Sequence, residues 1–261
     1  MHLLGDLLMS IIIKSPREIA LIKDAGKIII DLFDILKENT LPGKSTWELA
    51  KIAGDFIRSR GAIPSCKNYE GYPGEICVSV NDTLVHGIPS KKIILKEGDI
   101  VSYDVLVTKN GYTADACRTY PVGKVSEEAL NLIKVTEEAF FVGVKEVKPN
   151  NRIGDISNAI EKYVESFGYS LTDEFGGHGV GREVHEDPLI PNVGKPHTGP
   201  KIVKGMTLAI EPMVNLGKKD VKIMDDGWTT KTCDGKICSH YENTVVVTDD
   251  GYEIITLKKG E

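Results

Sequence analysis

The sequence predicts an α+β fold built from two halves that are related by a pseudo-twofold axis. Residues 98–115 alternate β-branched and aromatic residues on both sides of Asn110-Gly111, which is the strongest short signal for a β-hairpin. Amphipathic helical patterns stand before and after this hairpin. The second half of the chain then repeats features of the first at a constant offset of 107 residues, as from Gly98 to Gly205.

Three helices are predicted from their start signals. Ser15–Glu18 is a capping box with Pro16 at the first helical position, and apolar residues follow it at three- and four-residue spacing. A second capping box, Ser45–Glu48, begins another helix, which Gly61 ends. A third helix is expected over about 126–144. Helices together with an antiparallel hairpin are compatible with an α+β fold.

The offset of 107 residues matches both helical and strand features. Pro42 aligns with Pro149, and the strand Gly98–Asp104 aligns with Gly205–Glu211. A carboxylate carried by a strand in one half therefore has a counterpart in the other. Matches among common residues also arise by chance, but one offset that spans helix and strand favours an internal duplication. We expect a site between the two halves, because ligand sites form preferentially at such interfaces.

Length and composition suit one large globular domain or two fused halves. The chain has 261 residues, of which 41% are hydrophobic and 27% charged. Its net charge of −6 gives no reason to expect a nucleic-acid partner, and no apolar run is long enough to cross a membrane. We expect a leader or alternative-start segment at 1–8, without signal-peptide features, and one domain at 9–261 with repeat halves at about 15–122 and 126–256.

The cysteine content indicates the compartment. The five cysteines are odd in number and have no zinc-finger spacing. Cys233 and Cys238 are expected to flank a turn rather than to bind a metal. Reduced thiols in a cytoplasmic protein are the simplest interpretation.

Two aspartates on the hairpin are predicted to share a face. A two-residue turn pairs Leu106 with Asp115, and Asp104, two residues from Leu106, points to the same side. The two carboxylates are then diagonal neighbours, about 7–8 Å apart at the backbone. Like charges so placed disfavour ionisation unless a cation lies between them. On this stretch alone, an edge strand whose polar face meets water explains the pair equally well.

Three further segments carry polar groups where apolar residues are expected. His178 lies in a glycine-rich loop, 175–181, whose glycines let the backbone approach closely. Glu211 lies in the middle of an apolar strand, 208–214, and Glu242 begins a hydrophobic strand. Each alone has an ordinary explanation, as a structural histidine or a solvated glutamate.

Taken together, these residues predict a metal site. Four carboxylates that converge on one site repel one another strongly without cations. Four carboxylates and one imidazole form a hard, oxygen-rich set that suits two divalent ions such as Mn, Fe or Co. Two such ions activate a shared water and polarise a carbonyl, as in aminopeptidases and phosphatases. The set comprises Asp104, Asp115, His178, Glu211 and Glu242.

The chain resembles the type I methionine aminopeptidases in their short bacterial form, over about residues 9–256. The motifs that carry the resemblance are His86-Gly-Ile-Pro, the pair Asp104 and Asp115, Gly177-His178-Gly-Val-Gly, Glu211-Pro212-Met213 and Tyr241-Glu242. The resemblance implies the pita-bread fold around a central antiparallel sheet. It also implies one catalytic domain that removes the N-terminal methionine from nascent polypeptides. We expect a small second residue to be preferred, because the cleft beside two metals leaves little space.

The resemblance also implies a role for each ligand. Asp104 would chelate one ion, while Asp115 and Glu242 would bridge both, and His178 and Glu211 would bind the other. Co, Mn or Fe(II) are the expected ions, and Zn or Ni would also fit. Glu211 would in addition accept and transfer a proton.

Two histidines beside the motifs are expected to act on the substrate. In relatives, the counterparts of His86 and His185 hold the scissile amide and stabilise the tetrahedral intermediate. A purely structural role is the alternative for both. The other histidines match no catalytic position and are expected at the surface or behind the ligands: His2, His197 and His240.

The pocket for methionine should be apolar, since the methionine side chain is long and polarizable. By resemblance its wall comprises Cys66, Tyr69, Tyr72, Cys77 and Trp228. Two positions depart from the family pattern. Val184 stands where a bulky aromatic residue is common, which predicts a roomier pocket. Asn243 stands where histidine is frequent, which predicts a change in metal affinity.

The resemblance implies nascent polypeptide N-termini as partners, with the ribosome as a further candidate, and a monomeric state.

Three alternatives remain open at this point. An Xaa-Pro dipeptidase of the same fold usually carries an additional N-terminal domain. Another dimetal hydrolase, such as a phosphatase, is compatible with the ligand set. A non-catalytic binding protein of this fold would typically have lost ligands, whereas here all five are present.

Overall fold

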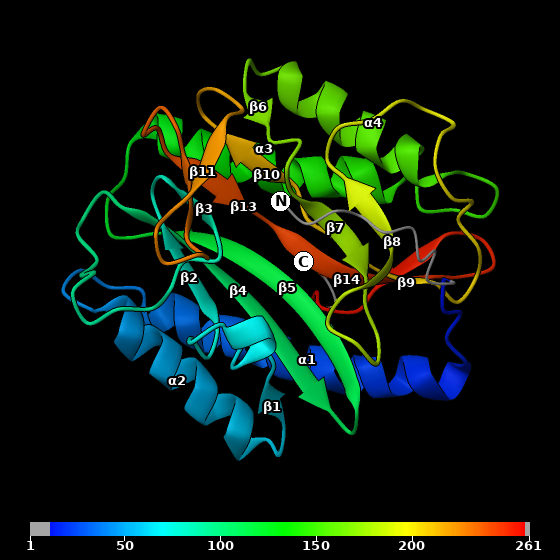
Figure 1. Ribbon diagram of the computed structural model, residues 1–261, viewed down its shortest axis with the longest axis horizontal. Coiled ribbons are helices and arrows are strands. Elements are labelled where there is room, and N and C mark those ends of the chain that lie inside the picture. Colours follow the sequence, from blue (N-terminus) through cyan, green and yellow to red (C-terminus); the bar gives the residue numbers. More distant parts are fainter. Residues whose placement is uncertain (1–10, 259–261) are drawn as a thin grey trace.

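An antiparallel sheet flanked by four helices forms the centre of the molecule (Figure 1). The computed structural model describes residues 11–258, so the expected leader at 1–8 and His2 lie outside the described residues. The helices are α1 (Pro16–Asn39), α2 (Thr46–Ser59), α3 (Glu127–Val144) and α4 (Ile153–Glu165), and a short 3₁₀ turn covers Tyr69–Gly71. None of the described helices is long and apolar enough to span a bilayer.

The central sheet has nine strands in the path β1-β4-β5-β14-β9-β7-β8, with β2 paired to β4 and β15 to β14. Its strands are β1 (Ile63–Pro64), β2 (Cys77–Val80), β4 (Ile100–Lys109), β5 (Tyr112–Pro121), β7 (Gly176–Gly179), β8 (Glu186–Pro191), β9 (Thr207–Ile210), β14 (Glu242–Val247) and β15 (Tyr252–Ile254). One small sheet joins β13 (Cys238–His240), β10 (Met213–Asn215) and β6 (Ser170–Leu171), and another joins β11 (Val221–Ile223), β12 (Thr230–Thr232) and β3 (Thr83–Val85).

The predicted helix starts are confirmed. The Ser15 side chain accepts a hydrogen bond from the backbone N–H of Glu18, whose carboxylate accepts one from the Ser15 N–H in return. Ser45 and Glu48 form the same reciprocal pair at the start of α2. These bonds satisfy backbone donors that the first turn of a helix leaves without partners. The third helix begins after Ser126, close to the expected residue.

The hairpin has the predicted register. Lys109 pairs with Tyr112 and Leu106 pairs with Asp115 along β4 and β5. Asn110 and Gly111 have φ values of 53° and 78°, as the two central residues of a type I′ turn require. Asn and Gly adopt this left-handed conformation more readily than other residues, so these two residues determine which pairs form across the hairpin.

The internal offset is visible in the positions of the elements. α2 begins at Thr46 and α4 at Ile153, and β4 begins at Ile100 and β9 at Thr207, each pair 107 residues apart. The second half departs from the offset after β9, because the short strands β10 to β13 precede β14. β14 pairs with β9 on one side and with β5 on the other, and so joins the two halves within one sheet.

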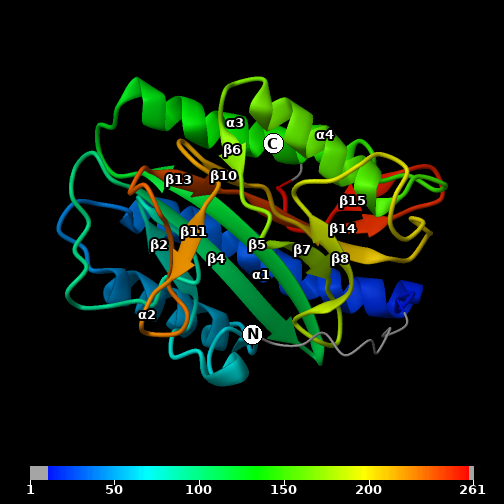
Figure 2. The same cartoon turned by 45° about the horizontal axis from the view of Figure 1, so that its top comes forward.

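Alternation along the strands separates a helix-covered face from a polar face. Val105 and Val107 of β4 pack with α1 and α2, whereas Leu106 belongs to a different apolar cluster on the other face. In the second half, Leu208 and Val245 pack with α3 and α4 in the same way. Figure 2 shows α1 behind β4 and β5 and the pair α3 and α4 along the upper side of the sheet. The helices therefore leave one face of the sheet free for a site.

Two sequence predictions about local structure are wrong. Glu211 does not lie within a strand but in the gap between β9 and β10, which belong to different sheets. Pro212 has no backbone N–H to donate, so the ladder ends there. His178 lies not in a loop but in strand β7, between β8 and β9.

The glycines beside His178 are required by close backbone contacts. A Cβ atom on Gly177 would lie 2.2 Å from the carbonyl oxygen of Ala209, and one on Gly179 would lie 2.3 Å from that of Asp187. Any larger residue would push β7 away from its neighbouring strand. The glycines thus allow a short strand to carry the histidine between two others.

We expect Gly177→Ala to lower the free energy of unfolding by about 1–3 kcal/mol, the usual cost of overpacking a buried contact. Gly251→Ala is the matched control, since no atom lies within 4 Å of the position that its new methyl group would take. Urea unfolding followed by circular dichroism measures both variants. Equal stability of the two variants would show that β7 shifts without cost, contrary to this account.

Candidate metal centre

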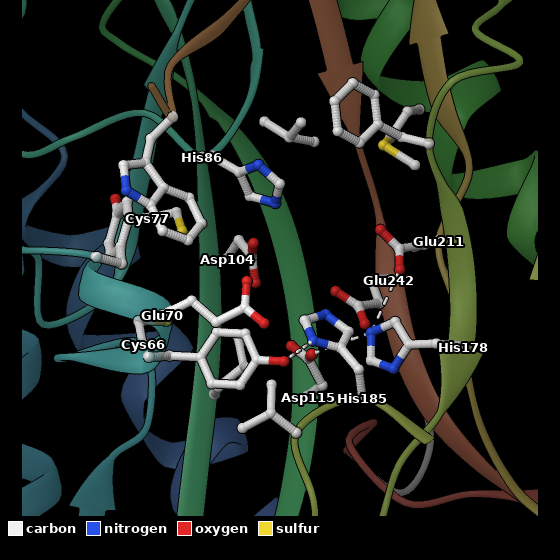
Figure 3. A pocket seen from close by; sticks show the side chains of 18 of the residues that line it. Cys66, Glu70, Cys77, His86, Asp104, Asp115, His178, His185, Glu211 and Glu242 are labelled. Carbon is white, nitrogen blue, oxygen red and sulfur yellow. Dashed lines mark hydrogen bonds and ion pairs between the residues drawn. The ribbon is translucent and has the colours of Figure 1, made fainter. Parts of the chain in front are cut away.

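All five predicted ligands line one cavity of about 300 Å³ on the face of the sheet that the helices leave free (Figure 3). Asp104 comes from β4 and Asp115 from β5, whereas Glu242 is the first residue of β14. His178 and Glu211 reach the same cavity from β7 and from the end of β9. The hairpin supplies one side of this cavity and the second half of the chain supplies the other.

The orientation of His178 leaves one ring nitrogen free to bind a cation. Its Nδ1–H donates to the carbonyl oxygen of Gly179 at 2.8 Å, which places the proton on that nitrogen. Nε2 therefore presents a lone pair, and it lies 3.6 Å from Oδ2 of Asp115 and 3.5 Å from Oε1 of Glu211. Metal-binding histidines usually donate their other ring N–H in this manner.

Several carboxylate oxygens in the cavity have no hydrogen-bond donor. Oδ1 of Asp104, Oδ1 of Asp115 and Oε1 of Glu242 are buried without a partner among the described residues. Buried oxygens of this kind are costly unless they bind a donor or a cation. Two groups of ligand atoms are each close enough to hold a single ion, one from Asp115, His178 and Glu242 and the other from Glu211, His240 and Glu242. The residues present therefore fit divalent metal ions.

Burial disfavours charge throughout this cavity when no cation is present. Desolvation raises the pKa of Asp104 to about 6. It also raises the pKa values of Asp115 and Glu242 well above those of ordinary carboxyls, and the charges of their acidic neighbours raise them further. The pKa of Glu211 is raised well above its usual range by burial. Burial lowers the pKa of His178 to about 3, so its imidazole is neutral at physiological pH.

The backbone behind the carboxylates is held by buried hydrogen bonds. The Thr244 hydroxyl accepts from the Asp115 N–H at 2.9 Å and donates to the Asp115 carbonyl at 2.8 Å. Arg118 donates to the carbonyl oxygen of Glu242 at 2.6 Å and to the side-chain oxygen of Asn243 at 2.7 Å. The side chain of Asn243 thus supports the strand that carries Glu242.

His86 and His185 both line the cavity. The Tyr69 hydroxyl lies 2.7 Å from Nδ1 of His185, whose ring is 4.2 Å from that of His178. His86 has a φ of 58°, a conformation that is uncommon for a residue with a side chain. Burial lowers the pKa of His86 to about 4 and also lowers the pKa of His185, so both rings are neutral at physiological pH.

The predicted wall of the methionine pocket lies next to these groups. The five predicted residues line the cavity together with Val184, and they belong to one apolar cluster with it: Cys66, Tyr69, Tyr72, Cys77 and Trp228. Tyr72 and Trp228 meet edge to face with ring centroids 5.2 Å apart. The expectation that Val184 makes this pocket roomier stays a prediction.

Some lining residues were not expected. Glu70, Leu106, Phe175 and Met213 also line the cavity. The position of Leu106 follows from the hairpin, because it stands two residues from Asp104 on the same face. Phe175 and Met213 adjoin the motifs of His178 and Glu211, but no pattern in the sequence distinguishes them from core residues.

The remaining described histidines differ in their surroundings. The side chain of His197 is 88% exposed, whereas that of His240 is 2% exposed. His240 lies behind the ligands, with Nε2 3.5 Å from Oε2 of Glu211 and 3.9 Å from Oε2 of Glu242. The signal that could have placed it here is its position two residues before Glu242, which puts both side chains on one face of an extended chain.

Known proteins resemble this chain over nearly its whole length. The profile of metallopeptidase family M24 matches residues 20–249. A methionine aminopeptidase from Clostridium perfringens is 52% identical over 249 residues, which cover 95% of this chain and 100% of that protein. A methionine aminopeptidase from Escherichia coli is 40% identical, and the match covers 97% of this chain and 96% of that one.

Solved structures agree with these relationships. The crystal structure of a methionine aminopeptidase from Thermotoga maritima superimposes with a TM-score of 0.94 at 44% identity, over 95% of this chain and 100% of that chain. A prolidase from Pyrococcus furiosus shares the fold, with a TM-score of 0.78 at 24% identity, but this chain covers only 66% of it. The fold is therefore the expected pita-bread fold.

A buried set of carboxylates and a neutral histidine on this fold is the arrangement that a metal-dependent hydrolase needs. The methionine aminopeptidases match 95–97% of this chain at 40–52% identity, whereas the prolidase at 24% identity shares the fold alone. The chain belongs to metallopeptidase family M24 and, within it, to the methionine aminopeptidases.

Proposed function

We propose that this metal-dependent enzyme, which removes N-terminal methionine, binds two divalent cations between the hairpin and the second half of the chain. The observation that carries the proposal is the set of buried carboxylate oxygens that have no partner among the described residues. Asp104 would hold one ion and His178 with Glu211 the other, while Asp115 and Glu242 would contact both. The oxygen-rich ligand set favours Mn(II), Fe(II) or Co(II), and the imidazole also allows Zn or Ni.

Bound cations of this kind lower the pKa of a water and polarise the substrate carbonyl. The protein itself supplies the proton transfer. Glu211 lies at the edge of the ligand set, and burial raises its pKa well above that of an ordinary glutamate. A carboxylate with a raised pKa accepts a proton from the attacking water and can return it to the leaving amine.

His86 and His185 are assigned to the substrate. Burial raises the pKa of Tyr69, so its phenol stays protonated, and we assign its O–H as the donor in the 2.7 Å contact with Nδ1 of His185. This bond places the proton of the neutral His185 ring on Nε2, from which it can donate to the substrate. A fixed neutral donor of this type stabilises negative charge on a carbonyl oxygen. His86, held in its uncommon backbone conformation at the cavity wall, would orient the scissile amide.

The apolar cluster beside the ligands is suited to the methionine side chain. Its aromatic residues and the two buried thiols, Cys66 and Cys77, provide soft, polarizable contacts for a thioether. We propose a preference for a small second residue, because the substrate and two ions would share a cavity of about 300 Å³.

The partners and the compartment follow from the substrate. We infer that the enzyme acts as a monomer on nascent polypeptides in the cytoplasm, close to the ribosome, and that it has no nucleic-acid or membrane partner. The five cysteines are all unpaired, which suits a reducing compartment. The net charge of −6 provides no electrostatic attraction for nucleic acids.

The substrate and the cofactor class are tested together with metal-stripped protein. We expect the protein to release methionine from a Met-Ala-Ser peptide only after Mn(II), Co(II) or Fe(II) is added. An Xaa-Pro dipeptide and a phosphate monoester serve as substrates for the rival activities, and neither should be hydrolysed. Hydrolysis of either one in place of the methionine peptide would contradict the proposal.

Asp104→Asn and Glu242→Gln should abolish peptide hydrolysis and reduce the number of Mn(II) ions bound per chain. Each change keeps the shape of the side chain but removes the charge that attracts the cation. Equilibrium dialysis with metal analysis measures the stoichiometry. Asp24→Asn, at an exposed position of α1, is the matched control and should bind as the unaltered protein does.

The contribution of Asp104 to the stability of the metal-free protein should fall as pH rises from 4 to 7. The folded chain raises the pKa of Asp104 from 3.8 to about 6, so it holds the proton more tightly than the unfolded chain. This stabilisation is complete below the unfolded pKa and is lost as pH rises through the folded value. The lowered pKa values of the buried histidines act in the opposite sense, so urea unfolding of the unaltered protein and of Asp104→Asn is compared at each pH, and the difference between the two measures the trend. Saturating Mn(II) should reverse it, because cations bind the ionised carboxylates; an unchanged trend would argue against binding there.

His86→Ala should lose most of its turnover while it still binds the same number of ions. Its ring packs edge-on to Phe175 and Trp228 and is not among the grouped ligand atoms. Peptide hydrolysis and metal stoichiometry are measured on the same preparation. A loss of ions in this variant would contradict the substrate-binding role that we assign to His86.

A further inference from the structure

His240 is a buried polar residue whose ring faces the carboxylates of two proposed ligands. Its side chain is 2% exposed, and Nε2 has no hydrogen-bond partner among the described residues. Nε2 faces two acidic groups, Oε2 of Glu211 at 3.5 Å and Oε2 of Glu242 at 3.9 Å. A buried ring nitrogen that faces carboxylates is expected to interact with them, because leaving it without a partner is costly.

Glu211 lies between two imidazoles. Its Oε1 is 3.5 Å from Nε2 of His178, and its Oε2 is 3.5 Å from Nε2 of His240. The two rings therefore contact different oxygens of one carboxylate. A group that engages one oxygen determines how the other oxygen is directed, since the carboxylate is planar and rigid.

The two imidazoles differ in what lies at their second nitrogen. Nδ1–H of His178 donates to the Gly179 carbonyl, which leaves its Nε2 as an acceptor and a metal ligand. For His240, the described residues provide no such acceptor at Nδ1. Nothing in the described chain thus prevents the proton of a neutral His240 ring from residing on Nε2.

We propose that His240 is a positioning residue whose Nε2–H donates to Oε2 of Glu211 and thereby directs Oε1 toward the metal. This inference rests on the proposed function, because it takes Glu211 to be a ligand and the proton acceptor. His240 does not bind the ion itself in this account. Its main chain is held independently of the ring, since its N–H donates to Thr119 at 3.1 Å and its carbonyl accepts from Thr119 at 2.8 Å.

The matched pair His240→Gln and His240→Met tests the donor. Glutamine can place an N–H near the position of Nε2. Methionine has nearly the same shape as glutamine but no hydrogen-bond donor. We expect the affinity for Mn(II) to fall about tenfold in the methionine variant, because the loss of such a supporting contact lowers metal affinity by at least about this factor. In the glutamine variant, the affinity should stay within about threefold of that of the unaltered protein. Titration calorimetry on metal-stripped protein measures both.

A second substitution and two controls keep the test decisive. His240→Asn places its amide near Nδ1 rather than Nε2, so it should lose affinity as methionine does, and it replaces that variant if methionine prevents folding. His197→Gln and His197→Met alter an exposed histidine and should bind Mn(II) normally. Equal affinities of the glutamine variant and the variants without a donor at Nε2 would overturn the proposal. Failure of the unaltered protein to bind Mn(II) would overturn the proposed function as well.

Pulsed electron paramagnetic resonance distinguishes a positioning residue from a ligand. Mn(II) bound to protein with ¹⁵N-labelled histidine should show coupling to imidazole nitrogen that disappears in His178→Ala and persists in His240→Gln. Coupling that persists in His178→Ala and disappears when His240 is also replaced would make His240 a ligand and overturn the proposal.

Discussion

The burial of four carboxylates in one cavity is the constraint on which the rest of the structure depends. Asp115 and Glu242 are almost fully buried, and desolvation together with mutual repulsion raises their pKa values. Without cations, the folded chain can relieve this repulsion only by protonating the carboxyls. This carboxylate cluster therefore destabilises the metal-free protein at neutral pH. The same cluster gives the enzyme its affinity for divalent ions.

The fold meets this constraint by taking four of the five ligands from strands and the fifth, Glu211, from the short link between β9 and β10. The type I′ turn at Asn110-Gly111 determines the register that places Asp104 and Asp115 on one face. Gly177 lets β7 approach β9 closely enough for His178 to reach the cavity. Thr244 and Arg118 then hold the backbone of the acidic residues from behind. Rigid elements of this kind position ligands more accurately than loops do.

Much of this arrangement was predictable from the sequence, because it depends on local signals. Capping boxes, the Asn-Gly turn and period-two alternation each act over a few residues, and the structure has them where they were expected. The features that were mispredicted depend on distant partners. The strand conformation of His178 arises from pairing with β8 and β9, and the break at Glu211 separates two sheets. The contact between His240 and Glu211 likewise requires β9 and β13 to meet in space.

Anomalous diffraction from crystals grown with Mn(II) tests the central claim most directly. The account predicts two anomalous peaks per chain within the cavity, one next to Asp104 and the other next to His178 and Glu211, with Asp115 and Glu242 near both. A single surface-bound ion, or no peak between the carboxylates when Mn(II) is saturating, would contradict it.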